Sequence, residues 1–239
     1  MKRYVIADLA VDMEVSGRTE RQAAAYAAEA NGPADITLSC DVRRVLELNP
    51  QITTEDMAQY LGTGMVFAHH LLAYYGTYLH ASAVVLGEKA YLFSAPSGTG
   101  KSTHTEKWCR LFGATYLNDD KPALRYVNQR WMAYGTPWSG KHDLSDPRGV
   151  AVGGIAFVRR GEENSIRRLP VVESVPLIMS QSLWMIKEPR VMDRQLEMVE
   201  KLVQEVPVWE LTCRNDDEAA WTSYKAMTET ENDLSCRPR

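Results

Sequence analysis

The chain has 239 residues, of which 27 are Lys or Arg and 31 are Asp or Glu, so its formal net charge is −4. Hydrophobic residues make up 45% and charged residues 24%, a composition typical of a globular protein and too apolar for a disordered one. General nucleic-acid binders and membrane-surface binders usually carry net positive charge, so we expect neither kind of partner.

The cysteines and the N-terminal residues indicate in which cellular compartment the protein is expected. The four cysteines are widely separated and form no C-x-x-C pair, which predicts neither a disulfide framework nor a zinc site. Asp8 and Asp12 interrupt the first apolar residues, unlike the core of a signal peptide. No stretch approaches the roughly 18 apolar residues of a membrane span. We therefore expect a cytoplasmic protein with reduced thiols.

Residues 1–75 are predicted to form a small N-terminal cap that is α/β or β-rich and ends in a long helix. Thr53 or Thr54 is a candidate N-cap, because acidic residues suited to a first helical turn follow at once. Apolar side chains then recur at helical spacing as far as Gly76, a residue type that commonly ends helices.

Beyond Gly76, short apolar runs alternate with turn residues, which predicts strands. Two tight hairpins are expected, one at Gly87 and the other at Asn128. A helix at residues 102–112 is expected to end at Gly113. The expected strands are 81–86, 89–95, 114–117, 124–127, 130–134, 150–158, 166–169 and 207–213.

The last third of the chain is predicted to be largely helical. Pro189 suits the first turn of a helix that carries an apolar face, and residues 216–227 suit a final helix. Residues 229–239 are polar, and we expect them to form a flexible tail.

The most informative segment is A-P-S-G-T-G-K-S, residues 95–102, between a predicted strand and a predicted helix. This is the context that a phosphate-binding P-loop requires. Glycines let several backbone N–H groups point into one concavity, and the helix dipole adds to their field. Lys101 would reach the β- and γ-phosphates, and the Ser102 hydroxyl would bind Mg²⁺. The expected nucleotide-binding residues are Ser97, Gly98, Thr99, Gly100, Lys101, Ser102 and Thr103.

Ala95 stands where the motif G-x-x-x-x-G-K-[ST] has its first glycine. Alanine does not adopt positive φ cheaply, so the loop must enter with ordinary strand geometry at this position. The alternative is a glycine-rich turn with an incidental lysine, but the flanking strand and helix favour a phosphate loop.

Asp119 and Asp120 follow the strand 114–117, and Asp119 lies 18 residues beyond Lys101. That spacing fits a helix of about three turns and a return strand. In a parallel neighbouring strand, these side chains would emerge at the edge that holds the phosphate loop. One carboxylate can hold Mg²⁺, and the other can accept a proton from an attacking hydroxyl. A solvated turn is the alternative, and which aspartate takes which role stays open.

Three segments, Y-L-H-A-S (78–82), S-G-T-G-K-S-T (97–103) and L-N-D-D (117–120), together with the predicted hairpin, resemble the HPr kinase/phosphorylase and ATP-dependent phosphoenolpyruvate carboxykinase superfamily. The resemblance extends over about residues 76–170 and is specific as a combination. It implies an α/β fold with a P-loop kinase core and a mixed sheet, preceded by a small N-terminal cap and followed by a helical C-terminal third. The kinase domain would span residues 76–228.

The resemblance also implies roles for individual residues. Lys101 would bind the nucleotide phosphates, and Ser102 and Asp120 would bind the metal. In the kinase branch an aspartate that matches Asp119 or Asp120 is the general base. His80 falls where both branches have a histidine beside the reacting phosphate, although a single histidine entering a strand is equally well a structural one. We therefore group Asp119, Asp120, His80 and Lys101 as candidate catalytic residues.

Two further segments are candidates for substrate contact. Residues 135–141, G-T-P-W-S-G-K, form a predicted loop after a strand and resemble a segment of HPr-kinase-like proteins encoded beside peptide-modification genes. Lys141 and His142 could face a phosphate or an anionic acceptor, or the segment is an ordinary tight turn. Arg159 or Arg160 could clamp a transferring phosphate, or both are solvated hairpin charges.

These features predict an ATP- and Mg²⁺-dependent kinase that transfers the γ-phosphate to a hydroxyl, with serine as the expected acceptor. The acceptor could belong to a peptide, a protein or a small metabolite. A nucleotide-binding regulatory protein without transfer and a nucleoside triphosphate hydrolase are the alternatives. The sequence identifies neither the acceptor nor the base, and it leaves open whether reverse phosphorylase activity exists. It also leaves open the oligomeric state, although the resemblance allows a homo-oligomer.

Overall fold

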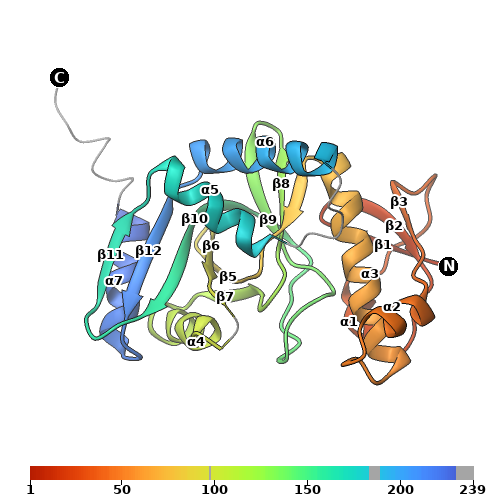
Figure 1. The fold of residues 1–239 in the computed structure, drawn as a ribbon, viewed down its shortest axis with the longest axis horizontal. Helices are drawn as coiled ribbons and strands as arrows, with labels where there is room; N and C mark the ends of the chain where they lie inside the picture. Colours follow the sequence, from red (N-terminus) through yellow and green to blue (C-terminus); the bar gives the residue numbers. More distant parts are fainter. Residues whose placement is uncertain (97, 183–188, 230–239) are drawn as a thin grey trace.

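A computed structural model of the chain describes residues 1–96, 98–182 and 189–229 (Figure 1). The first part contains a three-stranded sheet in the order β1-β2-β3, in which β2 pairs antiparallel with β1 and parallel with β3. We call this sheet and the helices around it the cap. Its elements are β1 (Lys2–Ile6), β2 (Leu9–Met13), α1 (Gly17–Ala23), η1 (Ala24–Tyr26), β3 (Ile36–Leu38), α2 (Val42–Leu48) and α3 (Glu55–Leu71).

The long helix α3 begins where the sequence predicts and ends earlier. The Thr54 side chain accepts a hydrogen bond from the backbone N–H of Met57, which confirms the N-cap. After Leu71 comes a short 3-10 turn, η2 (Leu72–Tyr74), and Tyr75 takes the left-handed conformation with φ 52°. The prediction that Gly76 ends the helix is therefore wrong. Gly76 begins a strand instead, where a Cβ would lie 2.9 Å from a neighbouring backbone carbonyl oxygen.

The second sheet has nine strands and is mixed, as predicted. Seven strands follow the order β4-β8-β9-β10-β6-β5-β7, while β12 pairs with the second half of β10 and β11 pairs with β12. The long strand β10 runs parallel to β6 and β12 and antiparallel to β9. The strands are β4 (Gly76–Tyr78), β5 (Ala81–Leu86), β6 (Lys89–Ser94), β7 (Thr115–Asn118), β8 (Ala123–Val127), β9 (Arg130–Tyr134), β10 (Gly149–Arg160), β11 (Ser165–Arg168) and β12 (Val208–Cys213).

Both predicted hairpins are confirmed. Strands β5 and β6 pair antiparallel across a turn at Gly87, which has φ 59°. Strands β8 and β9 pair across Asn128 and Gln129, whose φ values are 50° and 62°. Positive φ at both central residues of a two-residue loop matches the twist of the flanking strands, and asparagine tolerates it better than most residues.

The strand that carries Asp119 and Asp120 lies one place further along the sheet than the sequence predicts. β7 pairs antiparallel with β5, and β5 pairs antiparallel with β6, so β5 separates β7 from β6. The expectation of a directly neighbouring parallel strand is wrong, because the β5–β6 hairpin occupies that place. β6 and β7 still run in the same direction, and both end at one edge of the sheet.

Helices cover both faces of the nine-stranded sheet (Figure 1). One face packs on α5 (Val171–Gln181) and α6 (Pro189–Glu205), and the other packs on α4 (Lys101–Phe112) and α7 (Asp217–Thr228). Side chains of β6 alternate between the two cores, as a strand buried on both faces requires. None of the helices in the described ranges is long and apolar enough to cross a membrane.

The expected tail at residues 229–239 lies almost wholly outside the described residues, and the division into two domains stays a prediction. The helix at Pro189 and the final helix are confirmed. Helix α5, which contains Pro176, was not predicted as a separate element.

Helix α4 is fixed to α7 through a buried histidine. His104 is 4% exposed, and its Nε2 lies 2.9 Å from Ser223 Oγ. Trp108 Nε1 donates a hydrogen bond of 2.9 Å to the same oxygen. Burial lowers the pKa of His104 from 6.5 to about 4, so its neutral form is the one that folding favours.

Acid should therefore destabilise the fold through His104. Between pH 6.5 and 4, His104 is protonated in the unfolded chain and neutral in the folded protein. The free energy of unfolding therefore falls as the pH is lowered. We expect this residue to contribute a loss of up to about 1.4 kcal/mol per pH unit in that window. Urea denaturation at pH 7.5 and 5.5 measures it, and His104→Asn should weaken the pH dependence. Equal pH dependence in both proteins would contradict the assignment.

Candidate functional site

Two glycines of the loop between β6 and α4 have the backbone geometry that the sequence predicts. Gly98 and Gly100 have φ values of 77° and 120°, which favour glycine, and Lys101 begins the helix directly after them. Ala95 enters the loop without positive φ, as expected. Ser97 lies outside the described residues. The first turn of α4, whose N–H groups have no acceptor within the helix, therefore lies at the edge of the sheet.

A cavity of about 510 Å³ opens at this edge and brings the separated sequence motifs together. It unites residues of the glycine-rich loop with His80, just before β5, and with Asp119 and Asp120, just after β7. Thr99 lines two adjoining cavities rather than this one. The lining residues are His80, Gly98, Gly100, Lys101, Ser102, Thr103, Asp119, Asp120, Gly140, Lys141 and Arg160.

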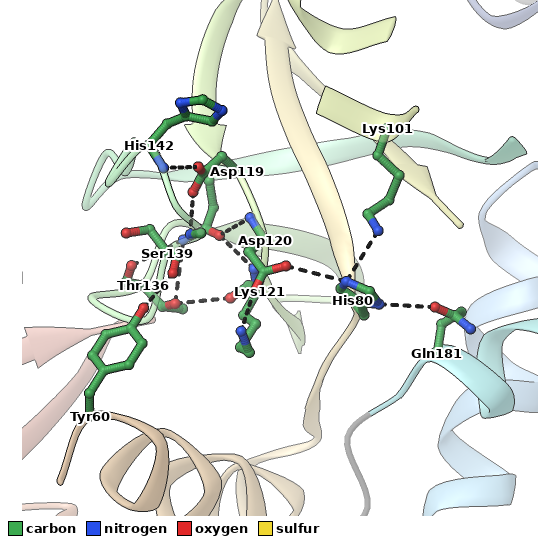
Figure 2. Close-up of polar contacts among 12 residues, drawn as sticks. Tyr60, His80, Lys101, Asp119, Asp120, Lys121, Thr136, Ser139, His142 and Gln181 are labelled. Carbon is green, nitrogen blue, oxygen red and sulfur yellow. Dashed lines mark hydrogen bonds and ion pairs between the residues drawn. The ribbon is translucent and has the colours of Figure 1, made fainter. Parts of the chain in front are cut away.

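The Lys101 side chain extends toward His80, as Figure 2 shows, and folds back to the start of its own loop. Its Nζ donates a hydrogen bond of 2.8 Å to the carbonyl oxygen of Ala95 and lies 3.1 Å from His80 Nε2. Burial lowers the pKa of Lys101, and the negative charge of Asp120 opposes that shift. The positively charged ammonium group of Lys101 therefore lies at the cavity wall, beside the backbone of the loop.

His80 stands between the lysine and one aspartate (Figure 2). Its Nδ1 lies 3.1 Å from Gln181 Oε1, and its Nε2 lies 3.3 Å from Asp120 Oδ1. A neutral ring that donates through Nδ1 to Gln181 leaves Nε2 free to accept from Lys101, whereas a doubly protonated ring donates to Asp120. Sequence reasoning missed Gln181, since it lies on the unpredicted helix α5.

Asp119 is buried, and the backbone of the 135–146 segment holds its carboxylate. The N–H of Gly140 donates to Oδ1 at 2.5 Å, and the N–H of His142 donates to Oδ2 at 3.2 Å. Only 5% of Asp119 is exposed. Burial raises the pKa of Asp119, and the two backbone hydrogen bonds oppose that shift. Both oxygens are therefore fixed in direction, and the proton affinity of the group is increased.

Asp120 has the opposite electrostatic environment. Burial raises its pKa, but the hydrogen bond with His80 and the charge and hydrogen bond of Lys121 outweigh burial and lower the pKa to about 2. Lys121 Nζ forms an ion pair with Asp120 Oδ2. Asp120 is thus an anion at any ordinary pH, while Asp119 takes up a proton more readily.

Asn118, which the sequence analysis did not place among the candidate site residues, shapes the turn that carries both aspartates. It is fully buried, and its Oδ1 accepts hydrogen bonds from the backbone N–H groups of Asp120 and Lys121 at 2.9 and 2.7 Å. Its amide nitrogen donates to the carbonyl oxygen of Thr136 at 3.0 Å. An asparagine directly before an Asp-Asp pair at a strand end is the signal that could have indicated this Asx-type turn.

The Trp138 segment contributes mainly backbone groups to the site. Trp138 is buried and donates from Nε1 to Thr63 Oγ1 at 3.0 Å, so it serves as a packing residue. Lys141 lines the cavity, in agreement with its predicted position. His142 is exposed and acts on Asp119 through its N–H alone, so a role for its imidazole is not supported.

The two arginines at the end of β10 have different partners. Arg160 lines the cavity and donates from Nη2 to the carbonyl oxygen of Gly98 at 2.6 Å and from Nε to that of Thr99 at 3.2 Å. Arg159 pairs instead with Glu210 on β12 at 2.8 Å. Arg160 is therefore the arginine that contacts the glycine-rich loop, whereas Arg159 contacts the neighbouring strand β12.

Metal binding at this site would depend on a bound phosphate. Among the described residues, no group of three or more His, Cys, Asp or Glu side chains could hold a metal ion. Mg²⁺ commonly takes one or two protein oxygens and completes its shell with substrate phosphates and water. Ser102 and Asp120 line one cavity and offer such a partial set of hard oxygen donors, so the residues fit Mg²⁺.

No protein-family model matches the chain, and no curated protein sequence matches it. Among solved structures, the Hpr(Ser) kinase/phosphatase from Coxiella burnetii matches with a TM-score of 0.38 and 10% sequence identity. The match covers 66% of this chain and 97% of that chain. These values are too low for any property of that protein to be carried over to this one.

The Asp119 hydrogen bonds give a stability prediction. A Cβ at Gly140 would lie 2.9 Å from Asp119 Oδ2 and 3.1 Å from its Cγ, so Gly140→Ala should displace the loop and leave a buried carboxylate short of a donor. Such a loss costs roughly 1–3 kcal/mol. Urea denaturation should show that loss for Gly140→Ala, whereas Leu144→Ala, which removes an exposed side chain of the same loop, should cost less than about 0.5 kcal/mol. Equal stability of the two variants would contradict the role of Gly140.

Proposed function

We propose that this protein is an ATP-dependent kinase that transfers the γ-phosphate to a hydroxyl group, with serine as the expected acceptor. One observation supports the proposal most. A glycine-rich helix N-terminus, a buried lysine and two carboxylates with opposite pKa shifts line a single cavity. Phosphoryl transfer depends on positioning and charge stabilisation, and these are the groups that supply both.

The nucleotide phosphates would bind against the loop and the first turn of α4. The N–H groups of a first helical turn have no acceptor within the helix, so they are available to a bound anion. Lys101 would exchange the carbonyl oxygen of Ala95 for phosphate oxygens, a short movement for a flexible side chain. Arg160 already donates to the loop carbonyls and has further N–H groups available for phosphate.

Ser102 and Asp120 would hold Mg²⁺ with the phosphates. When bound, that ion supplies positive charge that neutralises the transferring group. Asp120 suits the task because its low pKa keeps it ionised, and His80 and Lys121 fix its orientation.

Asp119 is the better proton acceptor of the pair, because its pKa is raised. Its Oδ2 has only the longer backbone hydrogen bond and can accept another. In the proposed step the acceptor oxygen forms a bond to the γ-phosphorus, and the bond to the β–γ bridging oxygen breaks. ADP leaves, and the hydroxyl proton passes to Asp119. Lys101 and Arg160 stabilise the charge that moves onto the bridging oxygen.

Adjoining cavities suggest how the two substrates would approach. On the α4 side, a cavity of about 540 Å³ shares Gly100, Thr103 and Arg160 with the central one and suits a nucleoside. On the α5 side, a cavity of about 390 Å³ shares His80 and Asp120 with the central one and suits the body of the acceptor, whose hydroxyl would reach Asp119 in the central cavity. In-line transfer requires the leaving and attacking oxygens on opposite sides of the phosphorus, so we assign the two substrates to different cavities.

The test is transfer of label from γ-labelled ATP with Mg²⁺ into a lysate of the source cell, separated into polypeptide and small-molecule fractions. We expect label in one fraction, abolished by Lys101→Ala. Asp119→Asn should lower transfer by roughly 10²–10⁴-fold while ATP affinity stays within a few-fold, because only the proton acceptor is lost. Release of free phosphate alone would favour a hydrolase. ATP binding without turnover would favour a regulatory protein, and wild-type transfer by Lys101→Ala would refute the phosphate-loop assignment.

A further inference from the structure

The loop that holds Asp119 is itself held from outside the kinase core. Residues 139–143 present backbone N–H groups to Asp119 on one side and contact the cap on the other. Tyr60 on α3 donates its hydroxyl to the carbonyl oxygen of Ser139, as Figure 2 shows. The cap is therefore connected to the carboxylate through this short peptide segment.

Arg18 on α1 makes the most direct of these connections. Its Nη2 donates to the carbonyl oxygen of Gly140 at 3.0 Å and to Asp143 Oδ1 at 2.8 Å. The Gly140 peptide thus accepts a hydrogen bond from Arg18 through its oxygen, while the N–H of the same residue donates to Asp119. The guanidinium carbon also lies 4.3 Å from the centre of the Tyr60 ring.

The local sequence fixes Arg18 in this position. The backbone N–H of Arg18 donates to Asp56 Oδ1 at 2.8 Å, which ties the start of α1 to the first turn of α3. Gly17 has φ 54°, and a Cβ there would lie 1.9 Å from the Asp56 oxygen, so only glycine fits. Tyr60 lies one turn after Asp56 on α3 and supports the guanidinium plane.

An ordinary surface ion pair does not account for this arrangement. Arg18 is only 22% exposed in its side chain, and the same nitrogen serves a carbonyl oxygen as well as a carboxylate. Gln22, one turn further along α1, also contacts the segment, through Ser139 and Asp143. Two neighbouring polar side chains of a short helix are therefore directed at one five-residue segment of the site.

We propose that Arg18 is a positioning residue for phosphate transfer, which acts from the cap by fixing Gly140 and thereby the direction of the Asp119 carboxylate. The inference rests on the proposed function for its kinetic consequence. A carboxylate displaced by about 1 Å from its productive position can cost roughly 10²-fold in rate. Because Arg18 lies outside the cavity lining, its loss should lower the transfer rate and leave nucleotide affinity unchanged.

Hydrogen–deuterium exchange tests the physical link without any turnover. Amide protection of Gly140 and His142 should fall about tenfold or more in Arg18→Ala, because the segment loses its outer hydrogen bonds. Arg18→Lys should retain part of it. Arg21→Ala, an exposed arginine on the same helix, should leave it unchanged. Unchanged protection in Arg18→Ala overturns the inference, whether or not the protein is a kinase.

A double-mutant cycle on full-length protein tests the role in transfer. Arg18→Ala should lower the rate of γ-phosphate transfer roughly 10-fold to 100-fold with ATP affinity within twofold, and Arg18→Lys should restore part of it. In the Asp119→Asn background Arg18→Ala should have little further effect, since its target is gone. If the effects of Arg18→Ala and Asp119→Asn on the transfer rate are additive, Arg18 is a structural residue and not a positioning one. The same holds if Arg18→Ala lowers ATP affinity as much as it lowers the transfer rate. If the wild-type protein transfers no phosphate, the proposed function is refuted. Hydrogen–deuterium exchange alone then tests whether Arg18 fixes the segment that holds Asp119.

Discussion

The first turn of α4 presents backbone N–H groups that no carbonyl of the helix can accept, and the site is arranged around that constraint. Gly98 and Gly100 take backbone conformations that aim the helix end at the sheet edge, and Ala95 enters with ordinary geometry. The Lys101 side chain then folds back over the loop and satisfies the Ala95 carbonyl. An anion is the ligand that this concentration of donors and positive charge favours.

The two aspartates beside that anion site have different electrostatic environments. Asp120 lies between His80 and Lys121, and this pairing keeps it ionised. Asp119 has backbone donors and burial instead, so adjacent residues in the sequence have opposite pKa shifts. Two neighbouring carboxylates can thus divide the work of binding a cation and accepting a proton. The loop around Gly140 connects the cap to Asp119 through hydrogen bonds on both sides.

Local patterns predicted much of this structure, and long-range pairing was harder to predict. The hairpins, the start of α3 and the helix after the glycine loop follow from turn chemistry, capping and periodicity. The position of β7 beside β5 depends on the pairing of the whole sheet. The prediction from the sequence considered only the strand before the glycine-rich loop and the strand that leads to Asp119, so it placed β7 wrongly. Gln181 and Arg18 were missed for the same reason, since each reaches the site from a distant element.

A crystal structure of the chain with Mg²⁺ and a non-hydrolysable ATP analogue tests the central claim most directly. The account predicts the triphosphate against the N–H groups of the first turn of α4, with Lys101 Nζ moved from the Ala95 carbonyl to phosphate oxygens. It also predicts the metal ion at Ser102 and Asp120, with Asp119 facing the γ-phosphate. A nucleotide bound elsewhere, or phosphates outside the cavity while Lys101 keeps its bond to Ala95, would contradict it.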